Sequence, residues 1–563
     1  MQLSARVTEA NNDTDPDAGA YPPCATRLES VKPQSRLSRG PITLCIVAIA
    51  SLALILRTQH VSRVSFDFDE ACSWKISQFP WDEMIEGVSH DAHPPLYYIF
   101  LKGLGALGVS SPPAIRASSV AFGVATVLAA FWFLWTALSS PQMRLSETER
   151  GLLALFAAAL VATSALHVEM SLRARPYPLG TVLTLLAGTF LIRATRRVGT
   201  AKDWGAFIVS TTMLSMVHYY ALFTVAALLL AAVLDVFFNY LRNGWNPEIR
   251  RSVFGLGVAA WGLQLVWVFW LPVFLFQRQR TTAQLWMGPL NWNEFCNNCW
   301  MALAGGQSVA VPAGCEWIAP SFWGGVVIAL FVCGGSTGRV AAICAGLPVL
   351  ETAGYCLAVR SIIGVKYLIF AQVFLLIATS LLIAKLRYSS LRVITAAGLL
   401  IWTGYWSWKH AEYRDDLVRF AGVQGAVKYL DRFRLPEEPV IVGSQFVHPI
   451  VQTYSAHPAA IYTNYGRNHR SDILGGPPLR LEDYANVSEL LKHPPDHLWT
   501  IDVFDLFRQG SRFEASLPGD WKIVRQEEFR EPFGIACVLA VREYRQVTNR
   551  SKPPEHDSNP AVE

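Results

Sequence analysis

The stretch ASSVAFGVATVLAAFWFLWTALS, residues 117–139, contains no charged residue and decides the class of fold. It exceeds the roughly 20 residues with which a helix crosses about 30 Å of hydrocarbon. Of the 563 residues in the chain, 52% are hydrophobic and 16% are charged, whereas about a quarter of the residues in soluble proteins are charged. We therefore expect a helical membrane protein and not a soluble multidomain enzyme.

Further apolar stretches occupy residues 41–56, 96–109, 151–167, 177–192, 204–217, 219–240, 253–276, 317–334, 339–357, 362–384 and 391–409. Basic residues are concentrated in the connectors between some of them, at Arg144, Arg150, Arg193, Arg196, Arg197, Lys202, Arg242, Arg250, Arg251, Arg339, Lys385, Arg387 and Arg392. The positive-inside rule places such connectors in the cytoplasm. All of them can lie there only if one apolar stretch between residues 57 and 116 does not cross.

The stretch predicted not to cross is 96–109. It is short, contains Lys102 and is bounded by proline pairs at 94–95 and 112–113, which is typical of an interfacial or re-entrant segment. We expect about eleven crossings with a cytoplasmic N-terminus. The turns around 168–176, 218, 277–316 and 358–361 then share the external face with the loop 57–115.

Composition divides the chain into four parts. Residues 1–40 and 546–563 are polar and are predicted to be disordered, the first as a cytoplasmic tail. Residues 41–410 form the membrane module, with 57–115 as its first external loop. Residues 411–545 combine an amphipathic helix pattern with short strand-like runs, PVIVGS, AAIYTNY, HLWTIDVF, WKIVRQ and ACVLAVREY. This mixture predicts a small soluble α/β domain on the external side.

Charge and cysteine content limit the classes of function. The formal net charge of +5 is too small for the basic stripe of a nucleic-acid-binding protein. The one local cysteine cluster is Cys296, Cys299 and Cys315. A zinc site normally has four ligands, and no His or fourth Cys lies near these three cysteines. The cluster could instead form a loop disulfide or consist of unpaired thiols.

The first candidate catalytic group is the carboxylate cluster in FDFDEACSW. Asp67, Asp69 and Glu70 follow the first span directly. Carboxylates this close repel one another, so at least one should have a raised pKa or a cationic partner. Such a group suits a general base, while a solvated acidic loop is the plain alternative.

The second candidate group is HDAHPPLYY, residues 90–98. Asp91 and His93 precede a Pro-Pro turn, which fixes the direction of the chain at the membrane surface. Tyr97 and Tyr98 follow, and tyrosine favours headgroup depth in any membrane protein. The segment is either part of a site or an interfacial anchor.

A third group consists of cations on the predicted external face, against the usual bias of Lys and Arg for the cytoplasm. They are Arg116, Arg173, Arg175, Arg278, Arg280 and Lys366. Such charges can bind a phosphate at headgroup depth, although any single one could snorkel to the interface. His218, Tyr219 and Tyr220 open another span at the same face.

Carboxylates and cations together at a membrane surface point to a reaction on a lipid-linked anion. The cations would bind a phosphate, and a carboxylate would remove a proton from an attacking hydroxyl group. Because a phosphate leaving from a sugar C1 needs no protonation, one base is enough, and a single displacement inverts the anomeric centre.

The ordered set of motifs resembles the GT-C glycosyltransferases, in particular protein O-mannosyltransferases and the bacterial transferases that add aminoarabinose or galacturonate to lipopolysaccharide. The matching motifs are the DE pair (Asp69, Glu70), D-x-H-P-P-L-Y-Y (Asp91 and His93 to Tyr98), the Arg that opens the next span (Arg116), A-R-P-Y (Ala174 to Tyr177), H-Y-Y-A-L-F (His218 to Phe223) and K-Y (Lys366, Tyr367). They occur in family order across about 300 residues.

The resemblance implies a multi-span helical module with juxtamembrane helices in the first external loop, followed by a small α/β extracytoplasmic domain. It implies a catalytic set of Asp69 as base with Glu70 and Asp91. Substrate and phosphate binding would then involve His93, Tyr97, Arg116, Arg175, Tyr177, His218, Tyr219, Arg278, Lys366 and Tyr367. The donor would be a polyprenyl-phosphate-linked hexose or pentose, and the acceptor a hydroxyl of a lipid, glycan or protein.

Two departures from the family pattern concern the same site. Relatives often carry S-Q-E-A-R-P-Y, whereas this chain has Arg173 before Ala174, with Glu169 nearby. Relatives often have R-Y where this chain has Lys366 and Tyr367, and Lys lacks the bidentate geometry of Arg. Some branches of the family use a divalent metal such as Mg or Mn and others use none; no metal ligand is assigned here.

The expected location is a bacterial inner membrane, with the site and the C-terminal domain outside the cytoplasm. Two other functions fit parts of the sequence. A transporter or flippase of lipid-linked sugars would show inverted repeats and polar residues near the middle of the membrane, where only Asp235 and Glu351 stand. A non-catalytic relative is suggested by Arg173.

Overall fold

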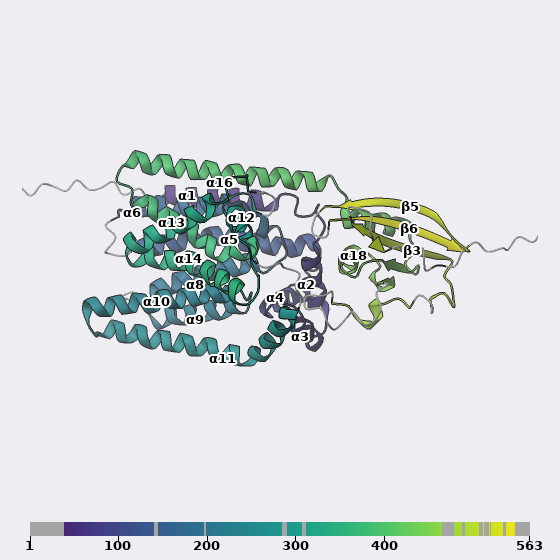
Figure 1. The fold of residues 1–563 in the computed structure, drawn as a ribbon, viewed down its shortest axis with the longest axis horizontal. Helices are drawn as coiled ribbons and strands as arrows, with labels where there is room; N and C mark the ends of the chain where they lie inside the picture. Colours follow the sequence, from purple (N-terminus) through teal and green to yellow (C-terminus); the bar gives the residue numbers. More distant parts are fainter. Residues whose placement is uncertain are drawn as a thin grey trace, which may run out of the picture.

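The structure is a computed structural model (Figure 1). It describes residues 39–139, 145–195, 199–283, 290–306, 311–463, 478–486, 490–505, 510–511, 517, 520–532 and 536–546. The predicted disordered tails lie almost entirely outside these residues.

The membrane module is a bundle whose long helices run along the long axis of the molecule (Figure 1). These helices are α1 (Arg39–Thr58), α5 (Pro112–Leu138), α6 (Glu147–Thr163), α8 (Tyr177–Ala194), α9 (Ala201–Ser215), α10 (Ala221–Asn243), α11 (Pro247–Ala283), α13 (Ile318–Cys333), α14 (Gly335–Ala358), α15 (Ile369–Ala384) and α16 (Ser389–Val418). Helix α5 begins with two prolines, which suit a first helical turn because its N–H groups need no partner there.

Seven helices in the described part of the chain are long and apolar enough to cross a membrane, or eight if the bent pair α6 and α7 (Ala165–Ser171) counts as one span. Helices α9 and α13 have 15 and 16 residues, and α16 contains the polar and aromatic run 402–408. The chain is therefore a multi-pass membrane protein. The expected number of about eleven crossings stays a prediction.

The centre of the bundle is formed by α8 and α15, whose apolar windows are 78% and 83% buried. Small residues allow the close approach. A Cβ on Gly180 would lie 2.6 Å from the ring of Phe370, and one on Gly188 would lie 2.9 Å from the ring of Phe133. Glycine on one helix and an aromatic ring on the next therefore fix this packing.

A bend of 59° separates α6 from α7 at Ser164. The buried guanidinium of Arg57 donates to the carbonyls of Val161 and Ala162 at 2.9 Å each. These carbonyls belong to the last turn of α6, where no amide of the same helix is available to them. Arg57 thus caps α6 from α1 at the point where the chain bends into α7.

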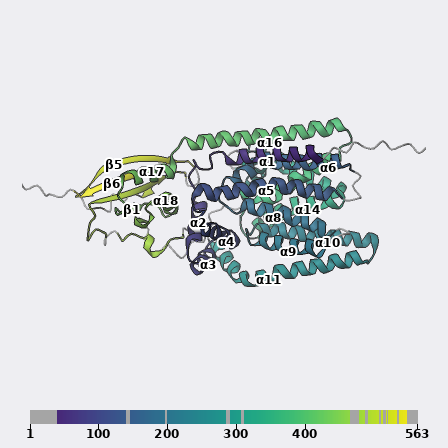
Figure 2. The same ribbon diagram turned by 180° about the vertical axis from the view of Figure 1, so that it is seen from behind.

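Short elements form the end of the bundle that faces the sheet (Figures 1 and 2). They include α2 (Phe68–Gln78), α3 (Trp81–Ser89) and α4 (Leu96–Ala106), with α12 (Trp292–Leu303) and the 3-10 helix η2 (Val365–Leu368) also joining long helices. Helix α4 has 11 residues, too few to cross a bilayer. It lies beside α2.

The C-terminal domain contains a six-stranded mixed sheet with the order β2-β1-β3-β6-β5, and β4 pairs with β3. Its strands are β1 (Val440–Val442), β2 (Ile461–Thr463), β3 (His497–Asp505), β4 (Gly510–Ser511), β5 (Trp521–Glu531) and β6 (Cys537–Gln546). Strand β1 is parallel to β2 and β3, whereas β6 is antiparallel to β3 and β5. Each of the five strand-like runs in the sequence forms a strand.

Two helices of the C-terminal region complete its core. Helix α17 (Gly422–Phe433) buries Val423, Val427 and Leu430, and α18 (His448–Tyr454) follows β1. Helix α16 extends to Val418, beyond the expected boundary at 410. The domain lies against the end of the bundle that carries α2 (Figure 2).

Candidate active site

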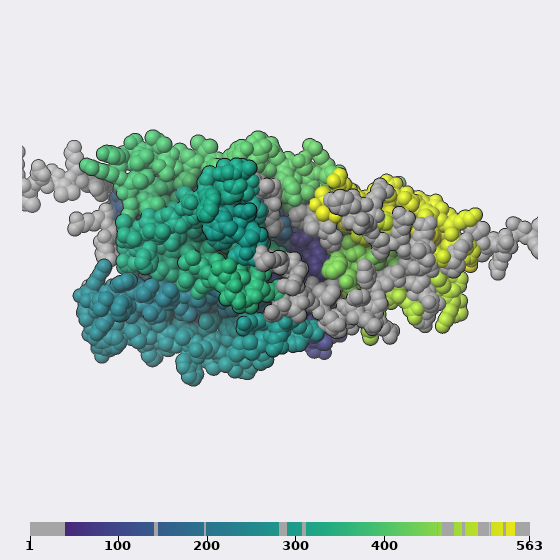
Figure 3. Space-filling model, viewed as in Figure 1, coloured from purple at the N-terminus to yellow at the C-terminus, as the bar shows by residue number. Residues whose placement is uncertain are grey.

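The predicted site residues gather where α2 begins, between the bundle and the C-terminal domain. Figure 3 shows this region as a recess in which the N-terminal part of the chain, in purple, is visible. Asp67 is the N-cap of α2 and accepts from the amide of Glu70, whose side chain in turn accepts from the amide of Asp67. This capping box fixes the start of α2 and the directions of its three carboxylates.

Only one of these three carboxylates is open to solvent. The side chain of Asp69 is 41% exposed, whereas those of Asp67 and Glu70 are 8% and 0% exposed. Burial and the charge of Glu70 raise the pKa of Asp67 to about 6. Asp69 is therefore the carboxylate that a substrate can reach.

Glu70 and Arg116 form a buried ion pair. Arg116 donates to the two carboxylate oxygens of Glu70 at 2.8 and 2.6 Å, and to the carbonyls of Val61, Val64 and Ser65. Both side chains are 1% exposed or less. Burial acts to raise the pKa of Glu70, but Arg116 outweighs it and holds that pKa below its ordinary value.

This geometry does not fit the phosphate-binding role predicted for Arg116, whereas it fits the orienting role predicted for Glu70. Arg116 has its donors occupied by protein groups, so the expected contact with phosphate has no place at this guanidinium. Glu70 also accepts from the amide of Ala174 at 2.6 Å, so it joins α2 to the A-R-P-Y turn. Both residues hold the site in shape and do not face a substrate.

Asp69 faces two cations from distant parts of the chain. Its carboxylate lies 3.2 Å from the Nζ of Lys366 in η2 and 3.7 Å from a guanidinium nitrogen of Arg175 in the A-R-P-Y turn. Burial acts to raise the pKa of Asp69, but the charges of Arg175 and Lys366 outweigh it and hold that pKa well below its ordinary value. Without a ligand, Asp69 is an ionised partner of these cations.

Arg175 connects the two candidate carboxylate motifs. It donates to the backbone carbonyl of Asp69 at 2.9 Å, to Ser73 Oγ at 2.7 Å and to His93 Nε2 at 2.7 Å. The sequence motifs D-E, H-P-P and A-R-P-Y therefore meet at one guanidinium. Asp91 accepts a hydrogen bond from Tyr98 and acts electrostatically on the ring of His93.

Two neutral histidines stand beside Arg175, with ring centroids 4.9 Å apart. Burial lowers the pKa of both His93 and His218. His93 accepts from Arg175 through Nε2, and His218 accepts from the amide of Tyr220 through Nδ1 at 3.2 Å. The proton of each neutral ring must then be on the other nitrogen.

These other nitrogens, His93 Nδ1 and His218 Nε2, are buried and have no hydrogen-bond partner in the structure. A buried donor without a partner costs free energy. Both histidines line the same cavity. Each therefore offers a ligand in the cavity one N–H donor.

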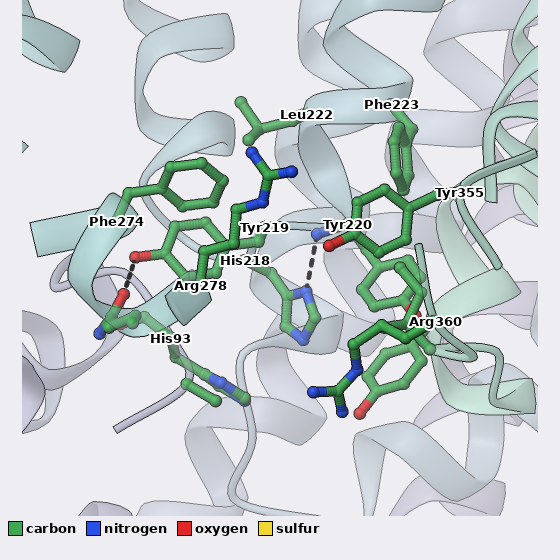
Figure 4. Close-up of a pocket in the computed structure, with 14 residues that line it drawn as sticks. His93, His218, Tyr219, Tyr220, Leu222, Phe223, Phe274, Arg278, Tyr355 and Arg360 are labelled. Carbon is green, nitrogen blue, oxygen red and sulfur yellow. Dashed lines mark hydrogen bonds between the residues drawn. The ribbon is translucent and has the colours of Figure 1, made fainter. Parts of the chain in front are cut away.

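The cavity has a volume of about 260 Å³ and a largely aromatic wall (Figure 4). Tyr220 and Tyr367 stack at 4.1 Å between ring centroids, and Tyr219 donates to Gln277. Figure 4 shows Arg278 and Arg360 on either side of the His218 ring. The cavity thus combines an apolar wall with cations and donors, which suits an anionic group on an apolar chain.

Arg360 was missed by sequence reasoning. Its Nε and Nη1 atoms are buried and have no hydrogen-bond partner in the structure, and it lines the cavity. The signal that could have found it is the one that marked the other cations, because it lies in a turn predicted to be external.

The remaining predicted residues lie around this centre. Tyr97 and Tyr177 are buried, and the hydroxyl group of Tyr177 has no hydrogen-bond partner in the structure. Arg173 forms ion pairs with Glu169 at 2.9 Å and with Asp67 at 3.3 Å. Arg173, the basic residue that replaces the acidic residue of the family pattern, thus has its charge neutralised by two acidic neighbours.

The described residues do not fit a metal centre. No group of three or more His, Cys, Asp or Glu side chains among them is arranged to hold a metal ion. Asp69 is directed at two cations, and a divalent metal would compete with these for the carboxylate. Cys296, Cys299 and Cys315 are free thiols in the structure.

No protein-family model and no curated protein matches the sequence. Solved structures do match the fold. ArnT from Cupriavidus metallidurans bound to undecaprenyl phosphate aligns with a TM-score of 0.56 and 11% identity over 90% of this chain and 98% of that one. The apo state of the same protein aligns with a TM-score of 0.52 and 11% identity over 89% and 98%.

A weaker match is the Pmt1-Pmt2 protein O-mannosyltransferase complex of S. cerevisiae bound to the sugar donor. Its TM-score is 0.33 with 17% identity, over 42% of this chain and 34% of that one. The likeness to ArnT confirms the predicted GT-C fold, with a helical membrane module followed by a small sheet domain.

Proposed function

We propose that this membrane protein of the GT-C fold is an inverting glycosyltransferase that moves a sugar from a polyprenyl phosphate to a hydroxyl acceptor on the external face. The observation that carries the proposal is the environment of Asp69. It is the one solvent-accessible carboxylate of the FDFDE motif, and it faces Lys366 and Arg175 beside an aromatic cavity.

The cavity supports a lipid-linked phosphate as part of the donor. Tyr220, Tyr367 and Phe223 give it an apolar wall suited to the first isoprene units. Arg278 and Arg360 at its wall can meet the phosphate charge. The ArnT structure was solved with undecaprenyl phosphate bound, which supports the same class of carrier here.

In the proposed reaction, Asp69 accepts the proton of the acceptor hydroxyl group. The oxygen of that hydroxyl group attacks C1 of the sugar at the same time. The bond between C1 and the phosphate oxygen breaks, and its electron pair leaves with the polyprenyl phosphate. Lys366 and Arg175 stabilise the charge that develops on this leaving group. One displacement of this kind inverts the anomeric configuration, and the phosphate needs no general acid.

Donor binding and base strength are coupled in this scheme. Lys366 and Arg175 hold the pKa of Asp69 low in the free protein, and a low pKa makes a weak base. When the phosphate takes up part of the charge of these cations, their effect on Asp69 weakens and its pKa rises. Asp69 would therefore become a competent base only after the donor has bound.

The buried residues around Asp69 have positioning roles in this scheme. The Glu70–Arg116 pair and the capping box of Asp67 hold the first turn of α2, and Arg175 fixes the backbone of Asp69 itself. Cations of the protein meet the phosphate charge, so we propose a reaction without a divalent metal. The acceptor is a hydroxyl-bearing lipid, glycan or protein.

The direct test is Asp69→Asn in membranes supplied with a labelled polyprenyl-phosphate sugar. The exposed carboxylate of Asp82 in α3 provides a matched control, Asp82→Asn. We expect transfer to fall by about 10²-fold or more in the Asp69 variant, since general-base catalysis contributes roughly 10²- to 10⁴-fold. Normal transfer by Asp69→Asn at a normal protein level would remove Asp69 from the role of base.

A further inference from the structure

A buried polar cluster joins α2 to the C-terminal domain. The Nζ of Lys75, in the last turn of α2, donates to Asp483 Oδ2 at 2.6 Å and to Gln452 Oε1 at 2.7 Å. Gln452 in α18 also donates to the other oxygen of Asp483 at 2.9 Å. The side chains of Lys75 and Asp483 are each 7% exposed, so this pair is shielded from water.

The cluster depends on both of its charges. Burial acts to raise the pKa of Asp483, but Lys75 outweighs it and holds that pKa below its ordinary value. Removing one partner of a buried pair leaves the other charge without compensation. Lys75 and Asp483 are 408 positions apart in the chain. The pair therefore joins the C-terminal domain to α2 and does not stabilise a local turn.

Helix α2 is also the helix that carries Asp69. Lys75 lies six positions further along it, which corresponds to about 9 Å along a rigid helix. The other end of α2 is held by the bundle through Arg116 and Arg175. The C-terminal domain makes a second contact next to α2, where the hydroxyl of Tyr454 accepts from the amide of Phe66 at 2.8 Å.

We propose that Lys75 and Asp483 are positioning residues, through which the C-terminal domain sets the orientation of α2 and so directs Asp69 at its substrates. The proposal rests on the proposed function, because it assumes that Asp69 is the base. It gives the C-terminal domain a part in the chemical step. Loss of the pair releases the last turn of α2 from the domain, and the resulting change in the tilt of this helix shifts Asp69 in its first turn.

The expected defect is in turnover and not in donor binding. The aromatic residues of the cavity and its cations Arg278 and Arg360 come from α10, α11, α14, η2 and the turns that adjoin them, and not from α2. A displacement of about 1 Å at a reacting group can cost roughly 10²-fold in rate. Breaking the pair should therefore lower kcat and leave the KM for the lipid-linked donor nearly unchanged.

The experiment compares Asp483→Asn with a matched control in the purified full-length protein. Asp502→Asn is the control, because Asp502 forms an equally buried pair with Arg542 at 2.5 Å inside the sheet domain. With a polyprenyl-phosphate sugar as donor, kcat of Asp483→Asn should fall at least about tenfold with KM within about twofold. Asp502→Asn should retain the kcat of the wild type.

A second variant separates positioning from loss of folding. Replacing both partners with apolar residues, Lys75→Met with Asp483→Leu, removes the buried charges and is often tolerated by a fold. This variant should melt near the wild-type temperature but keep a kcat at least about fivefold lower, because the oriented hydrogen bonds are gone. The conservative variant Lys75→Arg keeps the charge and should recover most of the rate.

The outcomes distinguish the two proposals. A wild-type protein that transfers no sugar overturns the proposed function, and the positioning role with it. An active wild type together with wild-type kcat in Asp483→Asn, or in the folded apolar double variant, overturns the positioning role alone. A loss of kcat in Asp502→Asn equal to that in Asp483→Asn would also overturn it, because the effect would then be one of general stability.

Discussion

Lys366→Met should reveal the coupling between the donor phosphate and the base. Lys366 lies 3.2 Å from Asp69 and belongs to the cation set that we assign to the phosphate. A hydrogen bond to a charged group contributes about 1.5–3 kcal/mol, which corresponds to a roughly 10- to 150-fold change in affinity. We therefore expect the donor KM to rise by about that factor, while Lys366→Arg retains most of the affinity.

The same variant has a second signature in the pH profile. Lys366 and Arg175 hold the pKa of Asp69 below its ordinary value, and the base form is lost as the pH falls through that pKa. Removing Lys366 raises the pKa of Asp69, so the acid limb of kcat/KM, which reports the free enzyme, should move to higher pH. If Lys366 acted only on the phosphate, the acid limb would stay at the pH of the wild type.

The assay is initial-rate transfer from a polyprenyl-phosphate sugar by purified protein, with donor concentration and pH both varied. Lys428→Met, at an exposed position of α17, is the matched control and should leave both parameters unchanged. An unchanged donor KM together with an unmoved acid limb in Lys366→Met would refute the coupling.

Three other predictions follow from the site. Glu70→Gln leaves Arg116 buried without its counter-charge and should destabilise the fold by about 3–5 kcal/mol, which a lowered melting temperature would show; a melting curve like that of the wild type contradicts it. His218→Phe should raise the donor KM about tenfold through the loss of one N–H donor. His218→Gln supplies an N–H group again and should recover part of the donor affinity. Equal kinetics in both variants would show that this N–H group does not bind the donor. Transfer should persist in excess EDTA, and a loss that Mg or Mn restores would show that a metal takes part.

Much of the fold could be predicted from local pattern. Long apolar runs predicted the long helices, and short β-branched runs predicted β1, β2, β3, β5 and β6. Both patterns can be read because they depend only on residues that are close together in the sequence. The predicted position of the boundary between the membrane module and the C-terminal domain was less accurate. Helix α16 continues to Val418, since the chain leaves the bundle as an uninterrupted helix although its hydropathy falls after His410.

That the residues of the site lie together could be predicted from Lys and Arg residues on the predicted external face, where such charges are unusual in a membrane protein. This reasoning marked Asp69, Arg175 and Lys366, and the structure places both cations within 4 Å of the Asp69 carboxylate as ion pairs. The charges alone could not separate Asp69 from Glu70, and only the resemblance assigned the base to Asp69 and an orienting role to Glu70. The difference between them is the partner Arg116, which lies 46 positions from Glu70 in the chain and becomes a buried neighbour only in the fold.

Long-range partners explain the other omissions as well. The carbonyls that Arg57 caps and the carboxylate that Lys75 meets lie 104 and 408 positions away. A single sequence carries no local signal for such pairs. Arg360 was overlooked for a different reason: it lies in a turn predicted to be external, and the criterion that selected the other cations was not applied to it.

The most direct measurement of the central claim is the fate of the carrier lipid. Purified wild-type protein is incubated with acceptor-containing membranes and either a polyprenyl-phosphate sugar or the matching nucleotide sugar, and the lipids are analysed by mass spectrometry. The proposed function predicts that free polyprenyl phosphate is released only from the lipid-linked donor, in step with transfer, and that Asp69→Asn releases almost none. An intact lipid-linked donor, or transfer from the nucleotide sugar alone, would contradict it.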